Sequence, residues 1–389
     1  MKNIFYTIYK YSLLLLLLQS MFAWFLWGQR VIIILLSGCL TILFALTGKE
    51  IFCNEKSNTI PVFFIIIIQL YVAKIDNVNG LIGALLSIVI LSAVLLLNDQ
   101  IKINLFQFFT RAFSIVLAIS LLAWIFFLLG ISLPHSHTNF NNGEYSFDNY
   151  YFFLLNNNYL IIPRFSSVFL EPGHMGMISS FLLFANRFDL KNKNVLIIFI
   201  CTLLTFSLAA YVLLLISVSA YIILNSRKPF RNLILWSVCV FILFSFFANY
   251  RDGNNAINNL ILMRLKIENG DIVGNNRVGR DFDDYFQQFM NSDNKFLGIG
   301  EAKYSKMIWK SGNAGYKVFI LQQGIFGTVL LFLLYFSMVI FKKSKLSLMF
   351  LVVYILSFLQ RAYALWDVEL LIFITALPIL FNIKNETDV

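Results

Sequence analysis

Long apolar runs separated by short polar breaks fill this sequence from end to end. Most runs hold roughly 20 residues, the length a helix needs to cross a hydrocarbon layer about 30 Å thick. The pattern predicts an all-α polytopic integral membrane protein with about 12 transmembrane helices. The predicted spans are residues 8–27, 31–47, 59–74, 79–97, 112–131, 168–186, 194–207, 208–224, 231–248, 316–341, 346–361 and 367–383.

The run at 194–224 is too long for one ordinary crossing. A break at Ser207 predicts two short helices, and one long tilted helix is the alternative. The cytoplasmic loops of membrane proteins carry an excess of lysine and arginine. If both termini are cytoplasmic, this chain follows that rule only when the run 194–224 crosses the membrane twice. The basic residues of the inner loops are then Lys49, Lys56, Lys102, Arg111, Arg187, Lys191, Lys193, Arg227, Lys228, Arg231, Lys342, Lys343 and Lys345.

This topology leaves two long polar loops outside, at about 132–167 and 249–315, within one membrane domain covering 1–389. In the second loop, apolar residues recur at helical spacing and predict amphipathic helices at the outer interface. They are Ile257, Leu260, Ile261 and Leu265, then Phe282, Tyr285, Phe286 and Phe289.

Composition agrees with a membrane protein, since 59% of residues are hydrophobic, 13% are charged and 42 are phenylalanine. A net charge of +10 would suggest nucleic acid as the partner of a soluble protein. Here the basic residues lie at the ends of apolar runs and report orientation, so no nucleic-acid partner is expected. Three of the four cysteines lie inside apolar runs, and no disulfide is predicted.

The segment 163–174 joins the first polar loop to an apolar run and carries Arg164, Glu171 and His174. An ionisable group at the mouth of a spanning helix is a functional candidate by default because charge is costly in hydrocarbon. The planar guanidinium of arginine donates two parallel hydrogen bonds to phosphate oxygens. Arg164 is therefore a candidate ligand for a diphosphate.

The second loop adds further arginines on the same predicted side of the membrane: Arg251, Arg264, Arg277 and Arg280. Arginines converging from two loops would suit an anionic headgroup that a lipid tail holds in the bilayer. The alternative for each arginine is a contact with lipid phosphate, or with a loop carboxylate such as Asp281 or Asp283.

Glu171 precedes Pro172, which suits the first position of a helix, and a carboxylate is favoured there by the helix dipole. Glu171 can pair with Arg164 or contact a substrate directly, and both readings stay open. His174 is a candidate general base, because an unperturbed imidazole has a pKa near ~6.5. The alternative is a hydrogen bond to a neighbour.

Two spacings raise the question of a metal. His135 and His137 form a His-x-His pair, but no cysteine or further histidine nearby completes a zinc site. Asp281 and Asp283 resemble the paired aspartates that hold a metal in soluble glycosyltransferases, although such pairs are common on surface helices. No metal or cofactor is predicted.

Several stretches together resemble the Wzy-type O-antigen polymerases, which are close in architecture to the O-antigen ligases. The resemblance covers the topology of the whole chain. Its motifs are residues 164–173, the loop arginines Arg277 and Arg280, Phe296-Leu297-Gly298-Ile299-Gly300, and 316–327 ending in Gln322-Gln323-Gly324-Ile325-Phe326-Gly327.

The resemblance implies a metal-independent membrane glycosyltransferase at the outer, periplasmic face of the bacterial inner membrane. It would move a growing glycan from undecaprenyl diphosphate onto a lipid-linked repeat unit, in the synthesis of lipopolysaccharide or a related surface polysaccharide. Arg164 and Arg280, supported by Arg277, would bind the diphosphate. Glu171 is the preferred carboxylate partner or base and His174 the reserve. The implied partners are the lipid-linked repeat units, membrane lipids and a chain-length regulator.

Three other functions remain open. In the ligase branch a histidine stands just before the helix that follows the second loop, and 313–316 contains none, which argues against a ligase. A flippase for lipid-linked oligosaccharide would line a central cavity with charges inside its spans and needs no large outer loop. A non-enzymatic membrane scaffold is a further alternative.

Overall fold

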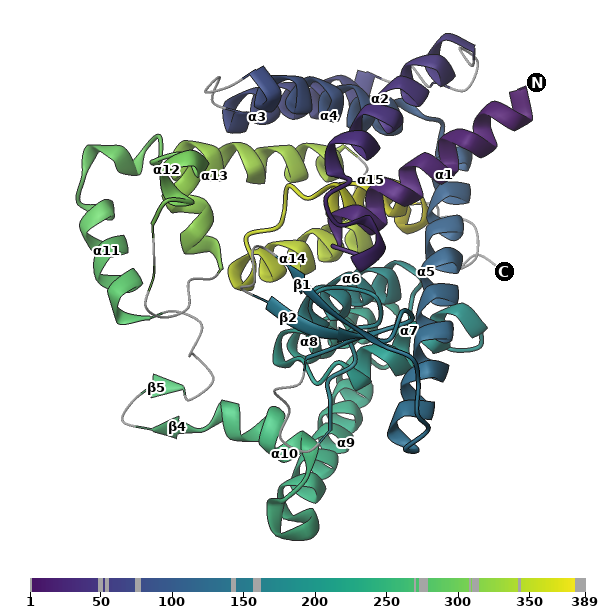
Figure 1. Ribbon diagram of the computed structural model, residues 1–389, viewed down its shortest axis with the longest axis vertical. Helices are drawn as coiled ribbons and strands as arrows, with labels where there is room; N and C mark the ends of the chain where they lie inside the picture. The colour runs from purple at the N-terminus through teal and green to yellow at the C-terminus, as the bar shows by residue number, and fades with distance from the viewer. Residues whose placement is uncertain are drawn as a thin grey trace. The chain divides into compact units, whose positions relative to one another are not determined.

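The computed structural model describes residues 2–47, 52, 56–73, 78–140, 145–156, 162–268, 271–272, 279–307, 309, 315–341 and 344–381. Its elements are labelled in Figure 1. The chain divides into two compact units, which are treated separately below. Unit 1 contains Met1–Ser20, Gly28–Phe106 and Asn276–Val389, and unit 2 contains Met21–Trp27 and Gln107–Asn275.

A helix lies in each stretch that the sequence marks as a span. Most boundaries differ from the prediction by only a few residues, but α5 begins at Asp99, 13 residues before the predicted start of its span at 112. These helices are α1 Lys2–Ser20, α2 Arg30–Thr47, α3 Lys56–Ala73, α4 Val78–Leu96, α5 Asp99–Leu128, α6 Pro172–Ala185, α7 Lys193–Leu204, α8 Leu208–Asn225, α9 Pro229–Asn249, α13 Tyr316–Ile340, α14 Lys345–Gln360 and α15 Asp367–Phe381.

Among the residues that the structure describes, five helical segments are long and apolar enough to cross a membrane, judged by length and composition: Arg30–Thr47, Asp99–Leu128, Leu208–Asn225, Pro229–Gly253 and Tyr316–Ile340. Helix α9 is the clearest, because none of its residues is buried, and Phe230 and Phe241 are 81% and 70% exposed. A helix that is apolar on all sides and unburied is stable only in lipid. The protein is therefore a membrane-embedded helical protein.

Two predicted boundaries are displaced by tertiary contacts. The first span was predicted to reach Trp27, but α1 ends at Ser20. Phe22 has a positive φ of 55°, which stops the helix, and the Trp24 amide donates to the Val168 carbonyl at 3.0 Å. Helix α6 begins at Pro172 rather than near Val168, because the residues before it are engaged with this turn.

The predicted break in 194–224 is confirmed. Helix α7 ends at Leu204, Phe206 has a φ of 44°, and α8 begins at Leu208. Ser207 is the N-cap of α8, and its side chain accepts a hydrogen bond from the Ala210 amide. Serine at this position satisfies one of the amides that a helix start leaves without a partner.

Helix α15 forms the core of unit 1, with nearly every residue from Val368 to Leu380 buried. It packs against α1, α4 and α14. The rings of Tyr335 and Tyr354 both lie 4.7 Å from that of Phe373, centroid to centroid. In unit 2 the corresponding element is α6, which is buried throughout from Gly173 to Ala185 and packs against α7 and α8.

The first polar loop carries a three-stranded antiparallel sheet in the order β1-β2-β3, which the all-α prediction did not anticipate. The strands are β1 Ser136–Phe140 and β2 Tyr145–Asn149, both labelled in Figure 1, and β3 Leu154–Leu155. One face packs through Phe147 and Leu154 against Leu170, with Trp27 and Phe140 beside them. Along β1 the side chains alternate between half-buried and exposed positions, as expected for a sheet with one buried face.

The second polar loop contains short elements. Helix α11, Arg280–Met290, confirms the amphipathic pattern there, since Phe282 and Phe289 are buried against Leu321. The helix predicted around Ile257 is present only as α10, Ala256–Leu260, followed by a 3-10 turn. The other short elements of this loop are η4 Tyr250–Gly253, η5 Leu262–Leu265, β4 Ile267–Glu268, β5 Asp271–Ile272, η6 Asp293–Lys295 and α12 Glu301–Tyr304. Outside the loop, η1 Trp24–Leu26 follows α1.

The close packing of α6 on α8 yields a stability prediction. A Cβ atom at Gly176 would lie 2.5 Å from that of Ala210, whereas one at Gly83 in α4 would meet nothing within 4 Å. Gly176→Ala should therefore lower the thermal unfolding midpoint of the purified protein in detergent, by overpacking worth about 1–3 kcal/mol. Gly83→Ala is the matched control and should be neutral or stabilising, because alanine favours helix. An equal loss in both variants would contradict the packing described.

Candidate functional site

The segment that carries Arg164, Glu171 and His174 lies in the interior of unit 2. Phe165, Ser167 and Phe169 are fully buried. The Ser167 hydroxyl donates to that of Ser120 at 2.7 Å, and its carbonyl accepts from the Leu154 amide at 2.9 Å. Segment 163–171 is thus a fixed strap held by hydrogen bonds on both sides, and it positions the candidate side chains at its two ends.

Arg164 is held at the end of helix α7. Its Nε donates to the Thr205 carbonyl at 3.0 Å, and the next amide, of Phe165, donates to the Leu204 carbonyl at 3.0 Å. These carbonyls are exposed to such donors because α7 stops at the break before Ser207. A cation is favoured at a helix C-terminus, where carbonyl dipoles point outward. The helix break predicted from the sequence is therefore what orients the candidate arginine.

Glu171 is the N-cap residue of α6 and Pro172 is its first helical residue, as expected from the sequence. One turn on, His174 Nε2 lies 3.7 Å from Glu171 Oε2. The histidine side chain is only 4% exposed, whereas that of Glu171 is 29% exposed. The two candidates for proton transfer are thus neighbours, with the carboxylate on the more accessible side. The predicted ion pair between Arg164 and Glu171 stays a prediction.

An aromatic ring lies beside the imidazole. The His174 ring centroid lies 6.4 Å from that of Phe22, and Phe22 in turn makes an edge contact with Phe140 of β1 at 5.5 Å. Phe22 therefore lies between Phe140 of strand β1 and His174 and contacts both rings. The displaced end of the first predicted span supplies Phe22, and no local sequence signal placed that residue beside the candidate base.

The arginines of the second loop have different settings. Arg280 is the first residue of α11 and is exposed, and it makes no hydrogen bond or ion pair with another residue of the described ranges. A cation at a helix N-terminus opposes the dipole, so helix stability does not explain it. Arg251 stacks on Tyr250, with its guanidinium carbon 5.5 Å from the ring. Arg277 lies outside the described residues. Arg164 belongs to unit 2 and Arg280 to unit 1.

Asp283, the second member of the Asp281-x-Asp283 pair, has a structural explanation. Asp283 Oδ1 lies 2.5 Å from the Lys317 ammonium nitrogen of α13, and the same ammonium sits 5.6 Å from the Phe286 ring centroid. This ion pair fixes α11 to α13. It gives Asp283 a role that requires no metal.

Two short motifs from the sequence resemblance are paired in unit 1. The Ile299 and Gly300 amides donate to the Leu321 and Gln322 carbonyls at 2.9 and 3.0 Å. Gly324 has a φ of 70° and interrupts α13 at this point. A side chain at Gly298 or Gly324 would collide with the backbone of the other segment.

The hydroxyl of Tyr71 joins the same junction. It lies 2.7 Å from the Gln323 carbonyl and 3.2 Å from that of Leu297. Non-helical backbone inside a membrane protein needs such partners, because lipid supplies none. Sequence reasoning did not single out Tyr71, which lies in a run of ordinary apolar residues.

The sequence reading also passed over Glu369. This residue lies in the first turn of α15, is 1% exposed, and its two carboxylate oxygens have no hydrogen-bond partner among the described residues. The Tyr354 hydroxyl donates to its backbone carbonyl at 3.2 Å. A buried carboxylate without a hydrogen-bond partner in an apolar helix is a functional candidate. Its position, an acidic residue within the apolar run 367–383, could have identified Glu369 from the sequence.

No protein-family model, curated protein or solved structure matches this chain.

The Asp283–Lys317 contact can be tested by charge exchange. Asp283→Lys places two cations together and should lower the thermal unfolding midpoint, and adding Lys317→Asp should restore it. A partly exposed pair is worth about 0.2–1 kcal/mol, so the shift will be small. Asp284→Lys, at the neighbouring exposed position, is the matched control and should not be rescued by Lys317→Asp. Equal behaviour of both pairs would refute the contact.

Proposed function

We propose that the protein is a Wzy-type O-antigen polymerase, a glycosyltransferase that extends a surface polysaccharide on a polyprenyl diphosphate carrier. The observation that carries the proposal is the strap at 163–171, which fixes Arg164 at one end and the Glu171–His174 pair at the other. This arrangement supplies a diphosphate ligand and a proton acceptor from eleven consecutive residues, 164–174. Both belong to the interior of one unit, so their separation is set by folding.

The proposed reaction needs little covalent chemistry from the protein. The acceptor hydroxyl oxygen forms a bond to the anomeric carbon of the donor glycan, and the bond from that carbon to the diphosphate oxygen breaks. The diphosphate leaves with the bonding electrons. Arginine guanidinium groups bind this leaving group and stabilise the charge that develops on it. Arg164 has this role in the proposal, together with Arg280 and Arg277.

The Glu171–His174 pair removes the proton of the acceptor hydroxyl. Glu171 is the more exposed of the two and is the preferred proton acceptor. His174 Nε2 lies 3.7 Å from Glu171 Oε2, so the imidazole can receive the proton from the carboxylate or orient the carboxylate. A positioned general base typically contributes 10²–10⁴-fold to a rate. Both substrates carry lipid tails, so we place the site at the membrane surface.

The proposal includes a topology. We infer about 12 crossings with both termini in the cytoplasm, so that the strap and the loop at 249–315 face the periplasm from the bacterial inner membrane. The helix break before Ser207 supports this count, because it divides the long run into two helices. The partners are undecaprenyl-diphosphate-linked repeat units, membrane lipids and a chain-length regulator.

The polysaccharide ladder of a deletion strain tests the proposed function. Without a polymerase, a single repeat unit should still be flipped and attached, so the gel should show core plus one repeat and nothing longer. Complementation by the wild-type chain should restore the ladder. Loss of all repeats would contradict the proposal and favour the ligase or the flippase.

Two arginine variants test the site itself. Arg164→Lys keeps the charge but loses the planar fork, and it should strongly reduce polymer length at equal protein level. Since Arg164 also contacts Thr205, its variant needs a stability measurement alongside. Arg280→Lys is the cleaner variant, because the described contacts give that side chain no part in folding, and it should reduce polymer at an unchanged thermal midpoint.

Arg231→Lys serves as the matched control for both variants. This exposed arginine near the start of α9 lies in a predicted cytoplasmic loop and should leave the ladder unchanged. Full-length polymer from a stably expressed Arg164→Lys variant would remove that residue from the site.

A further inference from the structure

The sheet in the first polar loop brings together three side chains that can bind a metal. In the register of β1 against β2, His137 lies directly opposite Asp148. His135 precedes His137 by two residues, and side chains at that spacing on an extended chain share a face. The carboxylate that joins the His-x-His pair thus comes from the neighbouring strand, where no search for nearby cysteines or histidines would find it.

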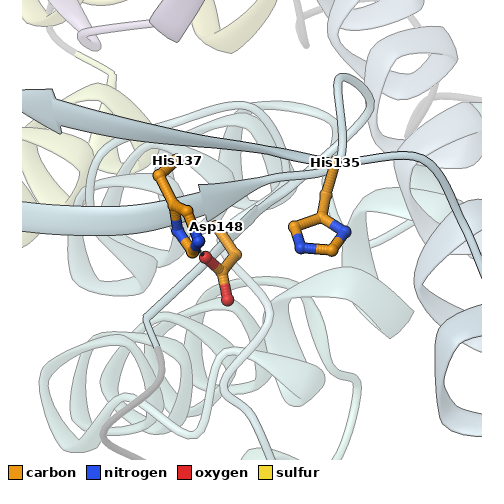
Figure 2. Close-up of side chains that lie close together, drawn as sticks. All are labelled: His135, His137 and Asp148. Atoms are coloured by element: carbon orange, nitrogen blue, oxygen red, sulfur yellow. Dashed lines mark ion pairs between the residues drawn. The ribbon is translucent and has the colours of Figure 1, made fainter.

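The ligand atoms are close enough to share one ion. His137 Nδ1 lies 2.5 Å from Asp148 Oδ1, and one ligand atom from each of the three residues lies within 4.8 Å of the other two. Figure 2 shows the His137 ring and the Asp148 carboxylate facing each other, with the His135 imidazole on the same side of the sheet. Donors about 2.0–2.1 Å from zinc are spaced near ~3.3 Å in a tetrahedral site, so only small side-chain rotations are needed.

Packing holds these groups in place. The His135 ring stacks on Tyr150 at 5.0 Å, and Tyr150 stacks on Phe153 at 4.7 Å. The opposite face of the sheet is anchored through Phe147 in the apolar cluster with Leu170. The Asp148 side chain is only 12% exposed, whereas that of His137 is 78% exposed. A shielded carboxylate beside two accessible imidazoles leaves one open side for an ion and its water.

We propose that His135, His137 and Asp148 form a binding site for a divalent transition-metal ion, with Zn²⁺ as the best-fitting ion. Two imidazole nitrogens and one carboxylate oxygen are a donor set that suits zinc, with water at a remaining position. A bound ion would take the place between His137 Nδ1 and Asp148 Oδ1 and draw in His135. The alternative is a His137–Asp148 ion pair beside a His135 ring that is held only by its stacking on Tyr150, and zinc binding distinguishes the two.

The site is independent of the proposed polymerase chemistry. Its sheet packs on Leu170, the residue before Glu171, so a bound ion would crosslink β1 and β2 directly over the strap. Binding to the folded state alone stabilises that state in proportion to the free ion concentration. We therefore assign the ion a structural role in the loop.

The test is zinc binding to the full-length protein in detergent, with the purification tag removed and metals stripped by a chelator. Isothermal titration should give one Zn²⁺ per chain, with no comparable binding of Mg²⁺ or Ca²⁺, which prefer all-oxygen ligands. His137→Ala and Asp148→Asn should each weaken binding by at least about 100-fold. X-ray absorption should detect two imidazole ligands in the wild type and one in His137→Ala.

Asn139→Ala is the matched control, because Asn139 is exposed on the same face of β1 two residues beyond His137. It should bind zinc as the wild type does. If the wild type fails to bind one zinc ion, or if His137→Ala and Asn139→Ala bind it equally, the site does not exist. None of these measurements involves polymer, so a negative result for zinc does not bear on the proposed function. A negative result in the polysaccharide ladder test likewise does not bear on the zinc site.

Discussion

The constraint on which this structure depends is that lipid offers no hydrogen bonds to the backbone. Every amide and carbonyl that leaves a helix inside a membrane must find a partner within the protein. The chain leaves helical geometry at the strap 163–171, at the break before Ser207 and at Gly324. At each place the freed groups are paired: the strap with Leu154 and Leu204, the break with Arg164, and Gly324's neighbours with Ile299 and Gly300.

The same constraint explains why the candidate chemistry lies where the helices stop. Thr205 offers its carbonyl to Arg164 only because α7 ends there, and Glu171 gains its position because Pro172 fixes the start of α6. Arginine and glutamate are thus held by helix ends rather than by helix faces. An anionic substrate reaching this site would meet groups already oriented by the fold, which reduces the cost of ordering them during binding.

Much of the helical framework could be predicted from apolar run lengths, and the division of 194–224 could be predicted from charge distribution. The end of α1 could not be predicted in this way. The chain leaves the helix at Phe22 and enters a turn in which the Trp24 amide donates to the carbonyl of Val168, far along the chain. The sheet in the first loop was not predicted either, because its strands are short and polar on one face. Arg164, Glu171 and His174 could be selected as candidates because charge is conspicuous at the edge of an apolar run. Asp148 and Tyr71 could not, because only tertiary pairing gives them significance.

The junction between Phe296–Gly300 and Gln322–Gly324 has a consequence for how the sequence can change. A side chain at Gly298 or at Gly324 would collide with the main chain of the other segment. Neither position can therefore accept a larger residue while the other segment stays in place. Drift at Gly298 and drift at Gly324 are therefore linked, although 26 positions separate them. Related sequences should keep both glycines or lose both together, and a sequence with only one must have rebuilt the bend in α13.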